Sequence, residues 1–143
     1  MKQKLETVIV DDDMLTLHYI KNIVKTAPIN GPIHTSENGK LAFEVLDGRK
    51  EDCDTILVFL DINMPVMDGW AFLELLQYKD YKHKIQVVMV TSSTDPADKL
   101  KSNKYPQVIG YLEKPVYPQV FAEIFNLFDK NIVITKNQNK QLD

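Results

Sequence analysis

The stretch VFLDINMPVMDG, residues 58–69, contains an apolar run that ends on one carboxylate and is followed by two chain-breaking residues. Residues 58–60 are typical of a buried strand, and Pro65 and Gly69 are typical of the loop that leaves it. We therefore predict that Asp61 lies at the carboxyl end of a central strand, where ligands bind in open α/β sheets. A carboxylate there serves as a metal ligand, a nucleophile or an ion-pair partner.

The composition around this stretch is that of an ordinary globular domain. The 143 residues are 44% hydrophobic and 26% charged, which is enough for one domain with a core. The net charge of -3 offers no basic excess, so we expect neither a nucleic-acid partner nor an anionic membrane surface. Cys53 is the single cysteine, and neither a signal peptide nor a membrane span is visible. We therefore expect a cytoplasmic protein.

Apolar runs alternate with helical patterns along the chain. Strands are expected at residues 7–10, 33–35, 55–60, 86–91 and 108–112. Helices are expected at residues 14–25, 41–46 (ending at Gly48), 70–78, from Pro96 onward, and 118–130. The helix starts have N-cap candidates in Asp13 and in Thr94 or Asp95. This alternation predicts a parallel sheet with right-handed crossovers and helices on both faces, and it leaves open which doubly wound strand order is present.

We expect one domain over residues 1–130. Residues 131–143 are rich in Asn, Gln and Lys, a composition typical of disordered segments.

Polar side chains follow four of the expected strands. Asp11 and Asp12 follow the first, Asp61 the third, Thr91 ends the fourth, and Lys114 comes just after the fifth. Because all strands of a parallel sheet end at the same edge, these groups are predicted to converge despite their separation in sequence. Taken alone, Asp11 and Asp12 would also be explained as helix-capping residues.

The predicted cluster has a definite chemistry. Three carboxylates at one edge repel each other, and Lys114 supplies only one positive charge. Ligands that are all oxygens favour Mg²⁺, which is often shared with a phosphate. An Asp beside such an ion can act as nucleophile toward a phosphoryl group, with the ion, Lys114 and the Thr91 hydroxyl neutralising the transferred charge.

Four segments together resemble a response-regulator receiver domain of two-component signalling, of the stand-alone type. They are VIVDDD (8–13), VFLDINMPVMDG (58–69), MVTSS (89–93) and GYLEKP (110–115). Each is weak alone, but their order and spacing are specific, and the resemblance spans about residues 5–130. It implies a flavodoxin-like α/β fold with five helices around a parallel sheet of strand order 2-1-3-4-5.

The resemblance also implies roles for individual residues. Asp61 matches the aspartate that accepts a phosphoryl group from a sensor histidine kinase or a histidine phosphotransfer protein. Asp11 and Asp12 match the acidic pair that holds Mg²⁺ together with Asp61, and Asn63 matches the position whose backbone carbonyl is a further ligand. Such a protein is a switch that slowly dephosphorylates itself, not an enzyme with an external substrate.

Two further positions match the switch residues of that family. Thr91 matches the hydroxyl that moves toward the phosphoryl group, and Tyr111 matches an aromatic residue that rotates inward on activation. Lys114 matches the lysine that pairs with the phosphoryl group, and the bond between Lys114 and Pro115 is implied to be cis. Glu113 is a departure that either opposes the phosphate or faces solvent.

The last expected helix carries two apolar stripes, one with Val120, Ile124 and Leu127, the other with Phe121, Phe125 and Phe128. Such a wide arc is explained by the core, but an exposed Phe stripe would bind a partner or a second copy. The family commonly uses the face of helix four, strand five and helix five for this purpose. Since only a short tail follows, the expected output is a downstream protein or a homodimer contacted through that face.

Three other functions are considered. A haloacid-dehalogenase-type hydrolase requires a second Asp two positions after the first, where this chain has Asn63. A flavin carrier requires a phosphate-binding loop after the first strand, where residues 11–13 are acidic and would repel the phosphate. A receiver that is never phosphorylated and only binds proteins is the remaining alternative, although every key position carries a competent residue.

Overall fold

The computed structural model describes residues 4–27 and 31–129 of the chain. The expected tail at residues 131–143 therefore lies outside the described residues. Within the described ranges, no helix combines the length and apolar character needed to cross a membrane.

The strands form one parallel sheet in the order β2-β1-β3-β4-β5. Their bounds are β1 (Leu5–Val10), β2 (Ile33–Ser36), β3 (Thr55–Leu60), β4 (Ile85–Thr91) and β5 (Val108–Glu113). β3 is buried along its whole length and pairs with β1 and β4. The order is the flavodoxin-like one that the resemblance implied, and all strands end at the same edge.

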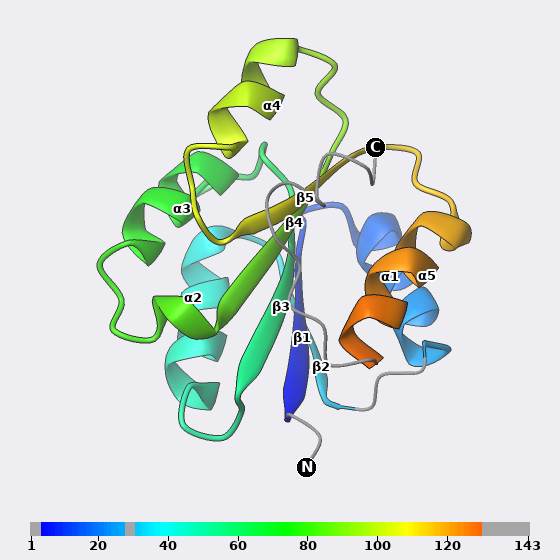
Figure 1. Ribbon diagram of the computed structural model, residues 1–143. Coiled ribbons are helices and arrows are strands. Elements are labelled where there is room, and N and C mark those ends of the chain that lie inside the picture. Colours follow the sequence, from blue (N-terminus) through cyan, green and yellow to red (C-terminus); the bar gives the residue numbers. More distant parts are fainter. Residues whose placement is uncertain (1–3, 28–30, 130–143) are drawn as a thin grey trace.

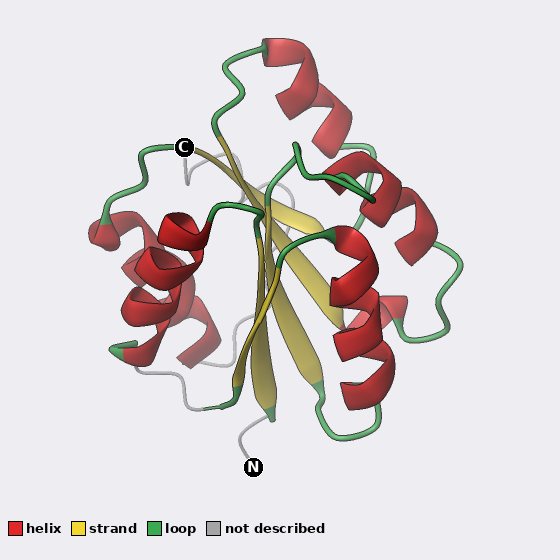
Figure 2. Cartoon of the chain, turned by 180° about the vertical axis from the view of Figure 1, so that it is seen from behind, coloured by secondary structure: helices red, strands yellow, loops and turns green. Residues whose placement is uncertain are grey.

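Helices cover both faces of the sheet. They are α1 (Met14–Lys25), α2 (Gly39–Arg49), α3 (Gly69–Leu76), α4 (Pro96–Ser102) and α5 (Pro118–Asp129), with a short 3₁₀ helix η1 (Lys82–Lys84) before β4. α1 and α5 lie together on one face, and α2 and α3 lie on the other, with α4 at the top of the view (Figure 1). The view from behind shows the sheet between these two layers (Figure 2).

Side-chain caps begin the helices that follow the strands. Asp13 accepts a hydrogen bond from the Leu15 amide, as predicted, and of the two candidates for α4 it is Asp95 that caps. The prediction that α2 ends at Gly48 was wrong, because the helix continues to Arg49. A helical glycine costs about 1 kcal/mol relative to alanine, and α2 nevertheless continues through Gly48.

The two faces of the sheet have separate cores. Phe72, Leu73 and Leu76 of α3 pack on one face, and Phe121, Ile124 and Phe125 of α5 pack on the other. Phe121 and Phe125 are 0% and 1% exposed and meet the Phe59 ring edge-on, with centroids 5.4 and 6.2 Å away. The hypothesis of an exposed Phe stripe is therefore wrong for these two residues; the side chains of Leu127 and Phe128 are outside the described part.

A buried ion pair joins β1 to the end of α2. Glu6 is 4% exposed and accepts from Arg49 Nε at 2.9 Å and Arg49 Nη2 at 2.6 Å. His34 Nε2 lies 2.8 Å from the same carboxylate, so His34 is a half-buried partner of this pair. The hydrogen bond from Arg49 is the main reason that the pKa of Glu6 is lowered, against the opposing effect of burial.

We predict that Glu6→Gln lowers the free energy of unfolding at pH 7 by about 1–3 kcal/mol, because Arg49 loses its anionic partner. The folded pKa of Glu6 is below its ordinary value of 4.5, so its contribution is complete above that pH and is lost as the pH falls through the folded pKa. Urea unfolding at pH 7 and pH 3 should therefore show the penalty shrinking in acid.

The control for this experiment is Glu51→Gln, because Glu51 is an exposed residue in the turn after α2. It should leave stability within about 0.5 kcal/mol of wild type at both pH values. A Glu6→Gln penalty that is as large at pH 3 as at pH 7 would contradict the assignment of the stabilisation to the charged pair.

Candidate functional site

The predicted polar residues meet at the carboxyl edge of the sheet. Backbone hydrogen bonds extend the strand pairing by one residue there: the Asp61 amide donates to the Val10 carbonyl at 3.0 Å, and the Lys114 amide donates to the Thr91 carbonyl at 2.8 Å. These two hydrogen bonds therefore fix the backbone positions of Asp61 and Lys114 at the edge of the sheet. This is the convergence that strand-end reasoning predicted.

Three carboxylates form the acidic part of the site. One oxygen from each of Asp11, Asp12 and Asp61 lies within 4.8 Å of the others. Asp11 and Asp61 are 2% and 7% exposed, whereas Asp12 is open to solvent. Asp11 Oδ1 accepts the Asp13 amide at 2.9 Å, which fixes the carboxylate at the start of α1.

Lys114 supplies the positive charge. Its Nζ donates to Asp11 Oδ2 at 2.8 Å and lies 3.6 Å from Asp61 Oδ2. Burial alone would lower the pKa of Lys114, but its hydrogen bond to Asp11 and the charges of both aspartates raise it overall. The lysine is therefore held as a cation between the two buried carboxylates. The peptide bond between Lys114 and Pro115 is cis, as the resemblance implied.

The environment of Asp61 disfavours the ionised form of its carboxyl group. Burial and the neighbouring charge of Asp11 raise its pKa, and Lys114, the Ile62 amide and the Thr91 hydroxyl offset part of that rise. The Ile62 amide donates to Asp61 Oδ1 at 2.8 Å, which orients the group. A buried carboxylate that is held in one orientation, and whose negative charge is only partly neutralised, is suited to bind a cation or to react with an electrophile.

The residues present fit a divalent cation. Three carboxylates face one ammonium group, which leaves two negative charges without a partner in the cluster. An all-oxygen donor set with one solvent-open side favours Mg²⁺, which keeps several of its waters. Asn63 lies on the exit loop with an exposed side chain, and its predicted role through the backbone carbonyl stays a prediction.

The exit loop of β3 folds back tightly behind Asp61. The Gly69 amide donates to the Ile62 carbonyl at 2.7 Å, and a Cβ on Gly69 would lie 2.5 Å from the Asp61 carbonyl oxygen. Only glycine permits this approach without moving the backbone that carries Asp61. Val66, at the tip of the loop, has a φ of 69°, which is costly for a β-branched residue.

The two predicted switch residues are both buried. Thr91 is 0% exposed, and its Oγ1 accepts the Ser93 amide at 3.3 Å. Tyr111 is 4% exposed, and among the described residues its hydroxyl has no hydrogen-bond partner. Burial raises the pKa of Tyr111, although the nearby Ser93 hydroxyl partly lowers it. Glu113 is exposed, in agreement with the reading in which it faces solvent.

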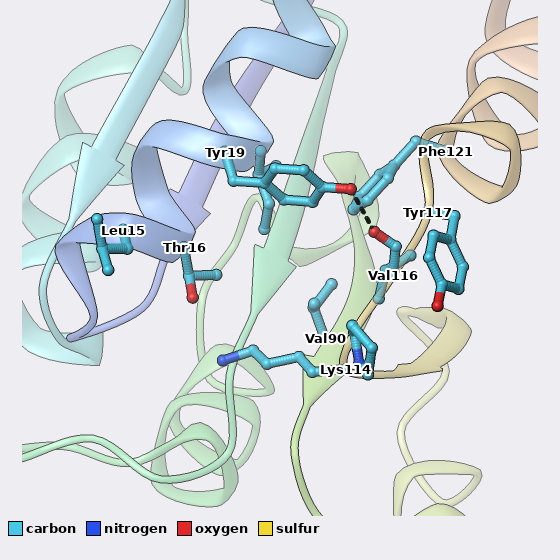
Figure 3. Close-up of a pocket in the computed structure, with 10 residues that line it drawn as sticks. Leu15, Thr16, Tyr19, Val90, Lys114, Val116, Tyr117 and Phe121 are labelled. Carbon is cyan, nitrogen blue, oxygen red and sulfur yellow. Dashed lines mark hydrogen bonds between the residues drawn. The ribbon is translucent and has the colours of Figure 1, made fainter.

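An apolar groove of about 560 Å³ lies beside Lys114, between α1 and the β5–α5 connection (Figure 3). The Tyr19 hydroxyl crosses it and donates to the Val116 carbonyl at 2.6 Å. Leu15 is 80% exposed and Tyr117 is 64% exposed on its two sides. An exposed apolar surface next to the candidate phospho-acceptor is a natural contact surface for another molecule.

Sequence reasoning missed two contacts around the site. Asp98 of α4 accepts the Ser93 hydroxyl at 2.5 Å, and Tyr19 ties α1 to the loop after Lys114. A sequence signal existed for the first, since Asp98 lies in the first turn of a helix whose start was predicted. The second joins residues 97 positions apart in the sequence, and no local pattern announces it.

A parallel sheet of this order defines a flavodoxin-like α/β fold, and the acidic cluster at its carboxyl edge fits a divalent cation. The sequence profile of the response regulator receiver domain matches residues 7–126. The chain belongs to the response regulator receiver domain family.

Curated relatives agree with that assignment. The probable transcriptional regulator ycf29 of Porphyra purpurea is 32% identical over 105 residues, which are 73% of this chain and 48% of that protein. The chemotaxis protein CheY1 of Helicobacter pylori is 28% identical over 119 residues, which are 83% of this chain and 92% of that protein. The two-component response regulator ARR10 of Arabidopsis thaliana is 27% identical, and the match covers 94% of this chain but only 23% of the plant protein.

Solved structures share the fold. A two-component response regulator from Cytophaga hutchinsonii superposes with a TM-score of 0.76 at 23% identity, covering 89% of this chain and 98% of that one. A CheY-like receiver domain protein from Methanospirillum hungatei gives a TM-score of 0.70 at 27% identity, covering 89% and 95%. The chain is of single-domain size and spans less than half of the ycf29 and ARR10 proteins.

We predict that Asp61→Asn raises the melting temperature at pH 7 in EDTA. The folded pKa of Asp61 is above its ordinary value, so the ionised group costs stability at neutral pH, and this cost is absent below the unfolded pKa. Each kcal/mol of repulsion relieved is expected to shift the transition by about 2–4 °C, as followed by circular dichroism. Saturating Mg²⁺ should stabilise the wild type more than the variant.

The matched control is Asp80→Asn, since the Asp80 side chain is 85% exposed and its 4.0 Å contact with Lys50 Nζ is a weak surface ion pair. It should leave the melting temperature unchanged with or without Mg²⁺. A melting temperature for Asp61→Asn that equals the wild-type value in EDTA would show that the carboxylate cluster carries no net repulsion.

Proposed function

We propose that this receiver domain accepts a phosphoryl group on Asp61 in a Mg²⁺-dependent reaction with a phosphohistidine donor. The observation that supports the proposal most directly is the buried Asp61 carboxylate, flanked by Asp11 and Asp12 and 3.6 Å from the Lys114 ammonium. This arrangement contains a nucleophile, a divalent cation site and a fixed positive charge at one edge of the sheet.

In the proposed transfer, an Asp61 carboxylate oxygen forms a bond to phosphorus while the bond from phosphorus to the donor imidazole breaks. The imidazole nitrogen leaves with the electron pair of that bond. Lys114 compensates the charge on one phosphoryl oxygen, and the Thr91 hydroxyl donates to another. Asp11, Asp12, Asp61 and the Asn63 carbonyl would hold a magnesium ion, which would neutralise further charge when bound. The Ile62 amide keeps the carboxylate oriented for attack.

The competing functions have less support from the site. A receiver that only binds proteins has no need for a carboxyl group whose pKa is raised by burial and by the neighbouring Asp11. A hydrolase with repeated turnover would need a general acid two residues after the nucleophile, where Asn63 stands. We therefore propose a switch with slow self-dephosphorylation and no external substrate.

Two surfaces are proposed for the partners of the switch. The apolar groove with Leu15, Tyr19 and Tyr117 lies beside Lys114 and would receive the histidine kinase or phosphotransfer protein. The face made by α4, β5 and α5 would contact the downstream protein or a second copy, with Leu100 68% exposed on α4.

The buried free thiol of Cys53 fits a cytoplasmic location.

We predict that incubation with acetyl phosphate and Mg²⁺ adds one phosphoryl group to the full chain, as measured by intact mass. Asp61→Asn should abolish the adduct because it removes the nucleophile. Lys114→Gln should slow its formation at least about tenfold, because the charge on the transferred group then lacks its fixed counter-ion. EDTA should prevent the reaction in the wild type.

Asp80→Asn is again the matched control, and it should be phosphorylated at the wild-type rate. An adduct that persists in Asp61→Asn would place the acceptor elsewhere. A folded wild type that binds Mg²⁺ yet takes no phosphoryl group would favour the protein-binding alternative.

We also predict that phosphorylation changes amide hydrogen exchange at residues 91–103 and 110–117, which include α4 and the end of β5. Thr91 and Tyr111 are the proposed switch residues. Tyr111 belongs to β5, which contacts α4, and its hydroxyl has no hydrogen-bond partner in the part of the chain that the structure describes. Exchange in α2 should stay unchanged, since that helix is anchored by Arg49 and Glu6 at the opposite edge of the sheet. An equal change across both regions would contradict a localised switch.

A further inference from the structure

Ser93 connects the hydroxyl of Thr91 to the first turn of α4. Its amide donates to Thr91 Oγ1 at 3.3 Å, and its hydroxyl donates to Asp98 Oδ2 at 2.5 Å. Ser93 Oγ also accepts the Asp95 amide at 3.3 Å. Ser93 and Asp98 are both half-buried, and the short contact between a hydroxyl and a carboxylate is the stronger kind of hydrogen bond.

The amide of Ser93 constrains the Thr91 hydroxyl. A hydroxyl has one proton to donate and two lone pairs, and the Ser93 amide occupies one of these lone pairs. Thr91 is fully buried, so its side chain has no solvent partner that could compete. The proton of this hydroxyl remains available for donation toward Asp61, the neighbouring carboxyl group whose pKa the Thr91 hydroxyl lowers.

α4 itself is held by few contacts. Ser102 is its one buried residue, and Leu100 is 68% exposed. Lys101 Nζ lies 4.6 Å from the centre of the Trp70 ring and holds the second turn of the helix. The hydrogen bond from Ser93 to Asp98 holds the first turn, and it is the direct polar connection from this helix to the residue that orients Thr91.

We propose that Asp98 is a positioning residue for phosphoryl transfer to Asp61: it fixes Ser93, whose amide orients the Thr91 hydroxyl toward the acceptor. This inference rests on the proposed function of Asp61. Asp98 touches neither the acceptor nor the transferred group, and it acts only through Ser93 and Thr91. The same three residues make the position of α4 and the orientation of the Thr91 hydroxyl depend on each other.

The test compares phosphorylation rates of full-length variants with acetyl phosphate and Mg²⁺, followed by intact mass. Asp98→Ala should slow the reaction about fivefold, the loss expected for one hydrogen bond to a positioned group. Asp98→Asn keeps an acceptor oxygen for Ser93 and should recover most of the rate. In a Thr91→Val background, Asp98→Ala should have no further effect, because the hydroxyl that it positions is already missing.

Asp95→Ala is the matched control. It removes the cap of α4, whose side chain accepts the Ala97 amide at 2.9 Å, but leaves Ser93 and Asp98 in place. It should be phosphorylated at the wild-type rate. If Asp95→Ala is slowed as much as Asp98→Ala, or if Asp98→Ala reacts at the wild-type rate, the inference is overturned while the proposed function stands.

A second measurement separates the inference from the proposed function. If the wild type takes no phosphoryl group, the proposed function fails, and amide hydrogen exchange of the unphosphorylated chain then decides on the contact itself. Asp98→Ala should accelerate exchange at residues 92–94 more than Asp95→Ala does. Equal exchange in the two variants would show that Asp98 does not hold Ser93, and would overturn the inference on that ground alone.

Discussion

The mutual repulsion of carboxylates at one edge of a sheet is the constraint on which this site depends. Asp11 and Asp61 are buried there with a single ammonium group between them. Burying two anions is tolerated only when cations and hydrogen-bond donors compensate them, and here the compensation is incomplete. The remaining negative charge supports the divalent cation and the phosphoryl chemistry that we propose for this edge.

The rest of the fold keeps these charges in place. Strand pairing continues into Asp61 and Lys114, and Gly69 allows the exit loop to close behind Asp61. The aromatic contacts of Phe59 with α5 and the pair of Glu6 with Arg49 brace the sheet on both of its faces. Asp61 therefore follows a fully buried strand whose position is held from both faces of the sheet, as positioned chemistry requires.

The helix α4 contrasts with this rigid base. It has seven residues, buries only Ser102, and is attached to the site through Ser93 and Asp98. Elements with little buried area open at low free-energy cost, and they are the ones that move in switching proteins. Asp61 lies on a well-packed sheet, whereas α4 is held by few buried contacts. A change of charge at Asp61 can therefore shift α4 without disturbing the sheet.

Sequence patterns predicted most of the fold and of the candidate site. The strands and the helix starts follow from local periodicity and capping, as Asp13 illustrates, and helix ends are less certain because cap chemistry there is weaker, as the continuation of α2 to Arg49 illustrates. Convergence of Asp11, Asp61 and Lys114 was also predictable, because parallel strands end at one edge whatever the details of packing.

The sequence by itself thus determined the strand ends, the residue types placed there and the chemistry that they allow. Only the tertiary structure decided which partner each side chain contacts. Phe125 is buried against Phe59, and His34 is paired with Glu6, because of contacts between residues far apart in the chain. The link from Asp98 through Ser93 to Thr91 is different, because it joins residues only two and five positions apart in the chain. Periodicity in the sequence predicts that a side chain packs against the rest of the protein, whereas the identity of its partner depends on three-dimensional packing.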